Sequence, residues 1–221
     1  RPRRHKVAIA KQGGIAPLVA LAKSGTDGQK EQAAGALWSL ALNADNKVAI
    51  AKQGGIAPLV ALAKSGTGEQ KESAAAALWN LALNADNKVA IAKQGGIAPL
   101  VALAKSGTAG QKEWAAGALR NLAGNDDNRV AIAKQGGIAP LVALAASGTD
   151  GQKEHAATAL KLLAFNADNH IAIAKQGGIA PLVALATSGT DVQKEKAAAA
   201  LRNLARNDDV KRQIRDAGYS L

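Results

Sequence analysis

The stretch that decides the fold is Gly95-Gly96-Ile97-Ala98-Pro99-Leu100-Val101. Its Gly-Gly pair, with a proline three residues after the second glycine, recurs every 41 residues along the chain. Residues 43–83 and 84–124 are identical at 35 of 41 positions. A fixed period of this length indicates a repeat protein in which each unit packs against its neighbours. The five Gly-Gly pairs begin at Gly13, Gly54, Gly95, Gly136 and Gly177.

The composition predicts an all-helical chain. Aromatic residues make up 2% of the 221 residues, and Ala, Leu, Ile and Val supply most of the apolar side chains. Helix formers dominate, and no segment alternates β-branched with polar residues as a half-buried strand does. Because Cys is absent, disulfides, thiol catalysis and zinc–thiolate sites are excluded. No apolar run approaches the ~20 residues that span a bilayer, so we expect a soluble chain without membrane association.

Each unit contains signals for three helices. The first helix, Lys47 to Gln53, follows the capping candidates Asp45 and Asn46. The second begins around Pro58, because a proline in the first helical turn forfeits no backbone hydrogen bond. The third opens with a T-x-x-Q capping box and continues for about four turns. The five capping boxes are Thr26/Gln29, Thr67/Gln70, Thr108/Gln111, Thr149/Gln152 and Thr190/Gln193.

These segments resemble the armadillo repeat, in its β-catenin and vacuolar armadillo-protein branch. The resemblance is carried by Asn87-Lys88-Val89-Ala90-Ile91-Ala92, by Gly95 to Val101, and by Ala115-Ala116-Gly117-Ala118-Leu119-Arg120-Asn121-Leu122-Ala123. It covers nearly the whole chain and occurs five times. It implies a right-handed α-α superhelical solenoid of three-helix repeats, in which the third helices line a concave groove. HEAT repeats are the alternative fold, but they have two helices per unit and lack the Gly-Gly-Ile junction.

The expected organisation is a single solenoid over residues 1–221. Residues 207–221 align with the start of a sixth repeat, but polar side chains replace Val48, Ala49 and Ala51. Polar residues on a face that would otherwise meet another repeat predict a C-terminal cap helix. The near-identity of the units favours a consensus-designed chain over a recent natural duplication, because drift erodes duplicated units. The expected repeats are approximately 1–42, 43–83, 84–124, 125–165 and 166–206, followed by the cap at 207–221.

The positions at which the repeats disagree fall on one face of the third helix, opposite the invariant apolar positions such as Ala33 and Leu37. We call this set the variable stripe. It holds four of the five aromatic residues, which are costly in water and common in binding hot spots. A binding surface is therefore predicted. Two alternatives stay open: an unconstrained outward face, or rings that pack on neighbouring third helices. In repeat order the stripe comprises Gln32, Gly35, Trp38, Ser39, Leu42; Ser73, Ala76, Trp79, Asn80, Leu83; Trp114, Gly117, Arg120, Asn121, Gly124; His155, Thr158, Lys161, Leu162, Phe165; and Lys196, Ala199, Arg202, Asn203, Arg206.

The chemistry of the stripe changes along the chain. The resemblance implies that Asn80, Asn121 and Asn203 grip the backbone of an extended peptide, since an amide both donates and accepts. The tryptophan array that clasps lysines in the importin-α branch is not reproduced, because small residues occupy its position. Aromatic residues give way to cationic ones, so the groove suits a partner with apolar residues at one end and acidic or phosphorylated ones at the other. The predicted groove residues are Trp38, Trp79, Asn80, Trp114, Arg120, Asn121, His155, Lys161, Phe165, Arg202 and Asn203.

The function predicted from these patterns is non-enzymatic binding of an extended peptide by a monomer. The three histidines occupy non-equivalent places without a nucleophile or carboxylate constellation, so no catalytic residue, cofactor or metal is expected. The net charge of +11 supports nucleic-acid binding as an alternative, through clusters at Arg1–Lys6 and Arg202–Arg215. Most lysines recur in every repeat, however, which is typical of a solvated face. A designed solenoid without a ligand is the other alternative. A natural chain of this composition would be cytoplasmic or nuclear, and a designed one recombinant.

Overall fold

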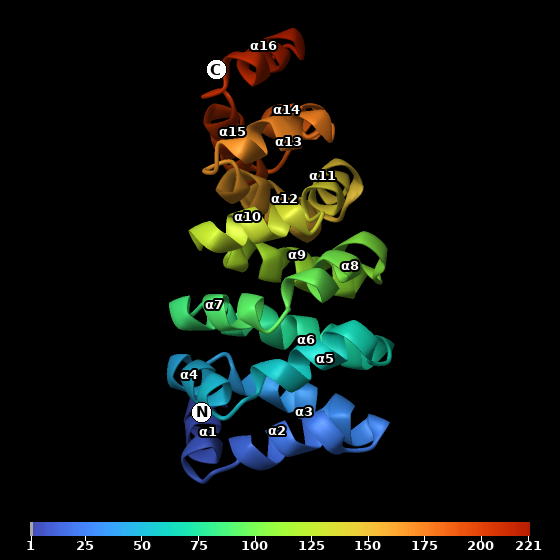
Figure 1. Cartoon of the computed structure of the whole chain (residues 1–221), viewed down its shortest axis with the longest axis vertical. Helices are drawn as coiled ribbons and strands as arrows, with labels where there is room; N and C mark the ends of the chain where they lie inside the picture. Colours follow the sequence, from blue (N-terminus) through green and yellow to red (C-terminus); the bar gives the residue numbers. More distant parts are fainter. Residues whose placement is uncertain (1) are drawn as a thin grey trace.

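The computed structural model describes residues 2–221, excluding the side chains of residues 1–5 and 7, where most of the N-terminal basic cluster lies. The described residues form sixteen helices and no strand. The helices stack along one axis, and the termini lie at opposite ends (Figure 1). The first helices of the repeats are α1 (Pro2–Lys11), α4 (Ala44–Lys52), α7 (Ala85–Lys93), α10 (Asp126–Lys134) and α13 (Asp168–Lys175). The second helices are α2 (Ile15–Ser24), α5 (Ile56–Ser65), α8 (Ile97–Ser106), α11 (Ile138–Ser147) and α14 (Ile179–Ser188). The third helices are α3 (Asp27–Leu40), α6 (Gly68–Leu81), α9 (Ala109–Leu122), α12 (Asp150–Leu163) and α15 (Asp191–Leu204), and α16 (Asp208–Asp216) ends the stack.

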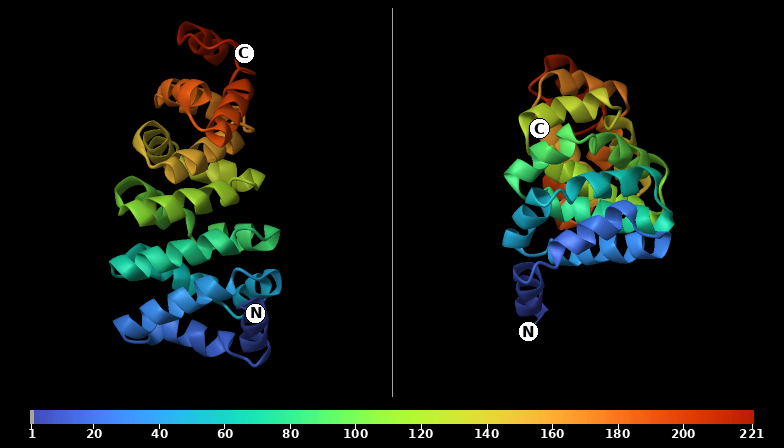
Figure 2. Two further views of the ribbon diagram at one scale, coloured as in Figure 1. Left: turned by 180° about the vertical axis from the view of Figure 1, so that it is seen from behind. Right: turned by 60° about the horizontal axis from the view of Figure 1, so that its bottom comes forward.

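The third helices form one continuous layer. Each packs against the third helix before and after it, and each second helix packs against the third helix of its own repeat. Seen from behind, the third helices cross the molecule one above another, on the side away from most of the first and second helices (Figure 2). The variable stripe is thereby carried on a single face of the molecule. This arrangement confirms the predicted all-α solenoid of repeated three-helix units.

The start signals of the helices agree with the sequence in part. All five predicted capping boxes are present, with each Thr side chain and each Gln side chain bonded to the other residue's backbone N–H. The first helices begin earlier than predicted, because Asn43 and not Asp45 or Asn46 is the cap. The Asn43 Oδ1 accepts a hydrogen bond from the backbone N–H of Asn46 at 3.0 Å. Asparagine is as good a cap as aspartate, so the run Asn43–Asn46 offered several candidates.

The two glycines of each junction are needed for different reasons. Gly95 ends α7 with a φ of 76°, in the left-handed region that glycine tolerates best. Gly96 has an ordinary helical φ, but a Cβ there would lie 2.6 Å from the Ile91 side chain. The Gly96 N–H also donates to the Ile91 carbonyl at 2.9 Å. The pair therefore turns the chain sharply while letting the second helix start close to the first.

Two ladders of side-chain amides connect each repeat to the one before it, and a third does so except at repeat 4, where Leu162 replaces the asparagine. Asn87 Nδ2 donates to the Lys47 carbonyl at 3.1 Å, and Gln111 Nε2 donates to the Gly68 carbonyl at 2.8 Å. In the third ladder, Asn121 Nδ2 donates to the Trp79 carbonyl at 3.0 Å. Equivalent bonds are made by Asn46, Asn128 and Asn169, by Gln70, Gln152 and Gln193, and by Asn80 and Asn203.

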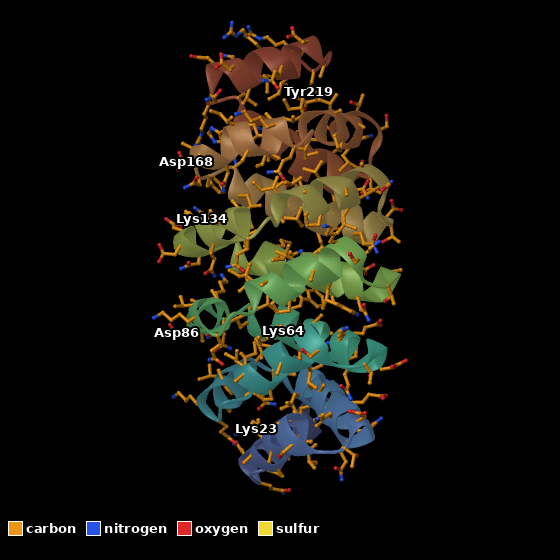
Figure 3. All side chains as sticks on the ribbon, turned by 45° about the vertical axis from the view of Figure 1, so that its right-hand side comes forward. Lys23, Lys64, Asp86, Lys134, Asp168 and Tyr219 are labelled. Atoms are coloured by element: carbon orange, nitrogen blue, oxygen red, sulfur yellow. The ribbon has the colours of Figure 1, made fainter. Side chains whose placement is uncertain are left out.

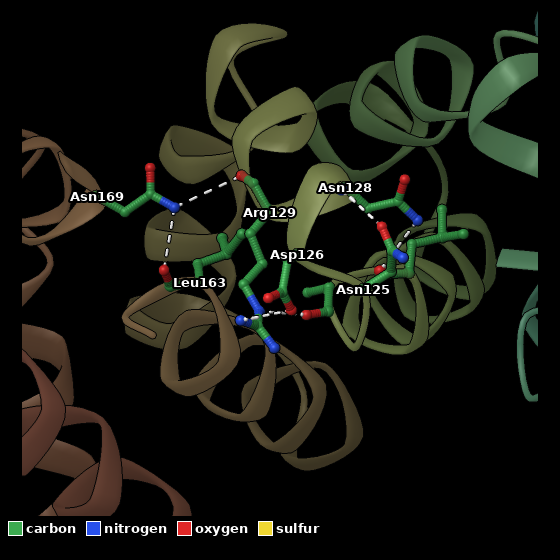
Figure 4. Close-up of polar contacts among 8 residues, drawn as sticks. Asn125, Asp126, Asn128, Arg129, Leu163 and Asn169 are labelled. Atoms are coloured by element: carbon green, nitrogen blue, oxygen red, sulfur yellow. Dashed lines mark hydrogen bonds and ion pairs between the residues drawn. The ribbon is translucent and has the colours of Figure 1, made fainter. Parts of the chain in front are cut away.

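Asn169 shows how such a rung is built (Figure 4). Its Nδ2 donates both to the Arg129 carbonyl of the preceding repeat, at 3.5 Å, and to the Leu163 carbonyl at the end of α12, at 3.0 Å. The side chain thus satisfies an end-of-helix carbonyl and bridges two repeats. In α16 the equivalent residue is Val210, which is 1% exposed, so this ladder does not continue into the last helix.

We expect Gly95→Ala to destabilise the fold by about 1–2 kcal/mol, because alanine is strained at a φ of 76°. The control is Gly68→Ala in the first turn of α6, where a Cβ meets nothing closer than 4.0 Å. Repeat 3 already has Ala109 at that position, and helix propensity predicts a gain of up to about 1 kcal/mol. Urea denaturation followed by circular dichroism measures both. A loss on Gly68→Ala, or none on Gly95→Ala, would contradict this account of the junction.

Gln111→Ala should cost more stability than Gln29→Ala, by about 1 kcal/mol or more. The Gln29 side chain accepts the capping-box bond from the Thr26 N–H and makes no inter-repeat bond among the described residues. Gln111 accepts the same bond from Thr108 and also donates to Gly68 of the preceding repeat. The difference between the two free energies of unfolding isolates the inter-repeat bond. Equal losses would show that the ladder contributes nothing beyond the cap.

Candidate functional site

The aromatic residues of the variable stripe form a row that crosses four repeats. The ring centroids of Trp79 and Trp114 are 5.1 Å apart, and those of Trp38 and Trp114 are 5.6 Å apart. Trp79 also packs on His155, at 5.8 Å. The Trp38–Trp114 and Trp79–His155 pairs each join repeats that are not adjacent in sequence. These tilted contacts are favourable geometries for aromatic rings, and they tie repeats 1 to 4 together along the stripe.

The tryptophans are less exposed than the sequence alone suggests. All three are half-buried, because each packs against another ring across the repeat boundary. Gly117 makes room for this packing, since a Cβ there would lie 3.0 Å from Trp79 Nε1. Trp79 Nε1 is buried and has no hydrogen-bond partner among the described residues. Phe165 is the exposed aromatic residue of the stripe, at 46%, and the Arg129 guanidinium lies 5.2 Å from its ring centroid.

His155 and Arg120 form a polar contact beside the rings. Arg120 Nη1 lies 3.3 Å from His155 Nδ1. Burial lowers the pKa of His155 below its ordinary value of 6.5, and the neighbouring Arg120 charge lowers it further, while Glu154 and Glu113 act in the opposite direction. The lowered pKa favours the uncharged ring, in which Nδ1 can accept a hydrogen bond from the guanidinium.

The asparagines of the stripe are held within the protein. Asn80 is 3% exposed and Asn121 9%, and each amide nitrogen donates to a carbonyl of the preceding third helix. Asn121 Oδ1 additionally accepts from Arg120 Nε at 3.3 Å. Asn203 makes the same inter-repeat bond and is half-buried. These side chains thus stabilise the stack, and the remaining amide groups are what a ligand backbone could use.

The predicted cationic half of the stripe lines a cavity of about 380 Å³. Arg120 and Lys161 both contribute, together with Lys88 from α7 and Lys196 from α15. Gly124 leaves space beside them, since a Cβ there would approach Lys88 Nζ to 3.0 Å. Arg202 does not line this cavity and is exposed further along the stack.

A row of glutamates beside the stripe was missed by sequence reasoning. Glu31, Glu69 and Glu72 line a second cavity, of about 400 Å³, with Trp38 and Trp114. The Glu72 carboxylate accepts a hydrogen bond from the Thr108 hydroxyl at 3.3 Å, at the N-terminus of α9, where a negative charge is favoured. Glu31 and Glu72 have counterparts in every repeat, so a comparison of differing positions could not detect them. The pattern that could have revealed them is their constant position, one residue before the first stripe residue of each repeat.

The remaining repeated charges lie on other surfaces. Figure 3 shows Lys23 and Lys64 at matching places on successive second helices, whereas Asp86, Lys134 and Asp168 lie along the first-helix edge. Among the described residues, no group of three or more His, Cys, Asp or Glu side chains could hold a metal ion. No single helix in that part of the chain is long and apolar enough to cross a membrane, although two bent helix pairs have the length and composition.

The fold and this face define a class of helical-repeat solenoids whose third helices present a continuous surface. The Armadillo/beta-catenin-like repeat family matches residues 2–42, 43–83, 84–124, 125–165 and 166–206. The chain belongs to the armadillo repeat family. No curated protein sequence matches it closely enough to count as a relative.

Solved structures of engineered proteins are similar to this chain. One engineered protein is 34% identical, with a TM-score of 0.87, over 93% of this chain and 85% of its own. Another is 35% identical, with a TM-score of 0.91, over 96% of this chain and 53% of its own. A designed armadillo repeat protein in complex with the peptide (KR)4 shares the fold, with a TM-score of 0.83 at 22% identity, over 91% of this chain and 86% of its own.

We expect the pKa of His155 to lie below 6.5 and to rise when Arg120→Gln removes the neighbouring charge. Because burial acts most strongly, the pKa of His155 in this variant should stay below 6.5. A depressed pKa favours the neutral ring in the folded chain, so its contribution to stability is full above pH 6.5 and is lost as the pH falls through the folded pKa. Titration of the imidazole NMR signals measures both values. An unchanged pKa in the variant would rule out the Arg120 contact as a cause.

Proposed function

We propose that this chain is a non-enzymatic scaffold that binds an extended peptide along the variable stripe. The observation that carries the proposal is the location of the differences between repeats. They gather on the third-helix face, and two cavities that open there, of about 400 and 380 Å³, are lined by stripe residues. Near-identical units that differ mainly along one face are expected when that face has been varied for binding.

The two halves of the groove suit different side chains. Trp38, Trp79 and Trp114 offer half-buried rings to apolar side chains of the partner. Arg120 and Lys161 offer charges to acidic ones. With third helices ~8–10 Å apart, each repeat would address about two to three residues of an extended ligand. Glu31 and Glu72 add a carboxylate edge beside the rings, so a basic residue next to the apolar ones would also fit.

We propose that the asparagines of the stripe also contact the backbone of the bound peptide. Their amide nitrogens already donate to the preceding repeat, and Asn80 and Asn121 are almost fully buried. The half-buried Asn203 therefore has the amide groups most accessible to a peptide backbone. We also propose that residues 1–221 form one monomeric solenoid closed by α16 as a cap. Arg212, Gln213 and Arg215 of that helix are exposed. The near-identity of the repeats and the likeness to engineered proteins support a designed origin.

Selection from an unbiased peptide-display library against the purified chain tests the proposal. Enriched peptides should combine apolar residues in one half with acidic residues in the other, and should lose about tenfold or more in affinity on Trp114→Ser. Serine occupies the equivalent position in repeat 2, as Ser73, so the helix tolerates it. Fluorescence polarisation of a labelled peptide gives the affinities.

The matched control for this experiment is Lys105→Ala, on the second helix α8, where repeat 4 already has Ala146. Its affinity for the selected peptide should equal that of the parent chain. If no peptide is enriched, the chain is a solenoid without a peptide ligand. If enriched peptides bind Trp114→Ser as tightly as the parent, binding occurs away from the stripe and the proposal is wrong.

A further inference from the structure

The cationic cavity of the third-helix face is lined by four basic residues. Lys88, Arg120, Lys161 and Lys196 reach it from four different helices, α7, α9, α12 and α15. Glu154 is the one carboxylate among its lining residues. Lys196 Nζ pairs at 2.8 Å with Glu195, which does not line the cavity. Among the described residues, Lys88, Arg120 and Lys161 have no carboxylate within 4.0 Å. Positive charge is therefore concentrated at this point of the stripe, on a chain whose net charge is +11.

The guanidinium in this cavity is oriented before any ligand arrives. Arg120 Nε donates to Asn121 Oδ1 at 3.3 Å, and Nη1 lies 3.3 Å from His155 Nδ1. The rest of the planar fork remains available for an anion, and such a fork recognises phosphate oxygens in pairs. An arginine held by two neighbours also loses less conformational freedom on binding than a free one.

The space for a ligand group exists because of Gly124. Repeats 1 and 2 have Leu42 and Leu83 at this position, and Gly124 replaces them in repeat 3. A Cβ at Gly124 would lie 3.0 Å from Lys88 Nζ, so the glycine lets that ammonium group lie directly over the backbone. Leu83 and Leu162 line the same cavity and supply apolar contacts for the group that carries the charge.

The geometry points to this cavity as a subsite for a phosphomonoester, carried by a phosphorylated side chain of the bound peptide. This inference rests on the proposed function and adds the chemistry of one subsite. A dianion balances three unpaired cations better than a carboxylate does, and a phosphoryl group has three acceptor oxygens. A nucleic acid fits less well, because its successive phosphates would run past the repeated glutamates, including Glu113 and Glu154.

The experiment uses phenyl phosphate as the probe and ³¹P NMR titration of the full chain as the measurement. We expect saturable binding at pH 7.5 that weakens at high salt, and weaker binding of benzoate, measured by its competition with phenyl phosphate. Lys161→Gln should reduce the affinity for phenyl phosphate about threefold to tenfold, because a charge-assisted contact is lost. Gly124→Leu keeps every charge but fills the space with the residue of repeat 2, and should reduce the affinity by a similar factor.

The matched control is Lys105→Gln on α8, which changes the net charge by the same amount outside the cavity. The affinity for phenyl phosphate should not change. Equal weakening by Lys105→Gln and Lys161→Gln would overturn the subsite in favour of general charge attraction. Benzoate binding as tightly as phenyl phosphate would overturn the preference for a dianion.

Three further outcomes separate this subsite from its alternatives. A single-stranded oligonucleotide that binds more tightly than phenyl phosphate, and that loses affinity on Lys161→Gln, would overturn the peptide subsite in favour of a nucleic-acid surface. If phenyl phosphate does not bind while a display-selected peptide does, the subsite is wrong and the peptide-binding groove stands. If phenyl phosphate binds at the cavity but no peptide is enriched, the anion site stands and the proposed function is wrong.

Discussion

The structure depends on the hydrogen bonds that amide side chains make from one repeat to the next. A single unit cannot bury both faces of its helices, so stability requires stacking, and stacking places polar backbone groups of helix ends at a buried interface. Gln111 and its equivalents donate to carbonyls of the preceding repeat at 2.8–3.1 Å, and Asn87 and its equivalents do so at 3.1–3.5 Å. Leu78, Leu81 and Leu119, fully buried, fill the space between the rungs. The apolar contacts supply most of the driving force, and the amides fix the register.

This division of roles explains which residues repeat and which are free to vary. The faces of the third helix that touch other helices carry an invariant set, such as Ala115, Leu119 and Leu122, all fully buried. The stripe touches mainly itself, through rings that pack across repeats, as Trp38 does on Trp114. Apart from Asn80, Asn121 and Asn203, which bond to the preceding repeat, its residues can therefore change between repeats with little effect on the stack. The same separation lets one scaffold hold an aromatic half and a cationic half on one face.

The sequence predicted the architecture well because its signals are local and repeated. The capping boxes and the Gly-Gly junctions are bonds or dihedral angles within a few residues, so spacing alone identified them. The cap of the first helix was misplaced, because the run from Asn43 to Asn46 contains several residues with equal capping ability. The exposure of the tryptophans could not be predicted, since Trp79 meets His155 on a helix two repeats away. The glutamates beside the stripe were missed because they recur in every repeat, and only the positions that differ between repeats were considered.

The asparagines of the stripe show how one residue type can join two repeats and also orient a charged side chain of the stripe. In Asn121 the nitrogen holds the preceding repeat, and the oxygen accepts from Arg120, which in turn contacts His155. The inter-repeat register therefore sets the direction of the guanidinium that faces the cationic cavity. A change at one repeat boundary would move a charged group of the stripe as well as weaken the stack. The charged groups of the candidate site are thus positioned by the same bonds that join the repeats, so the geometry of that site follows from the regularity of the fold.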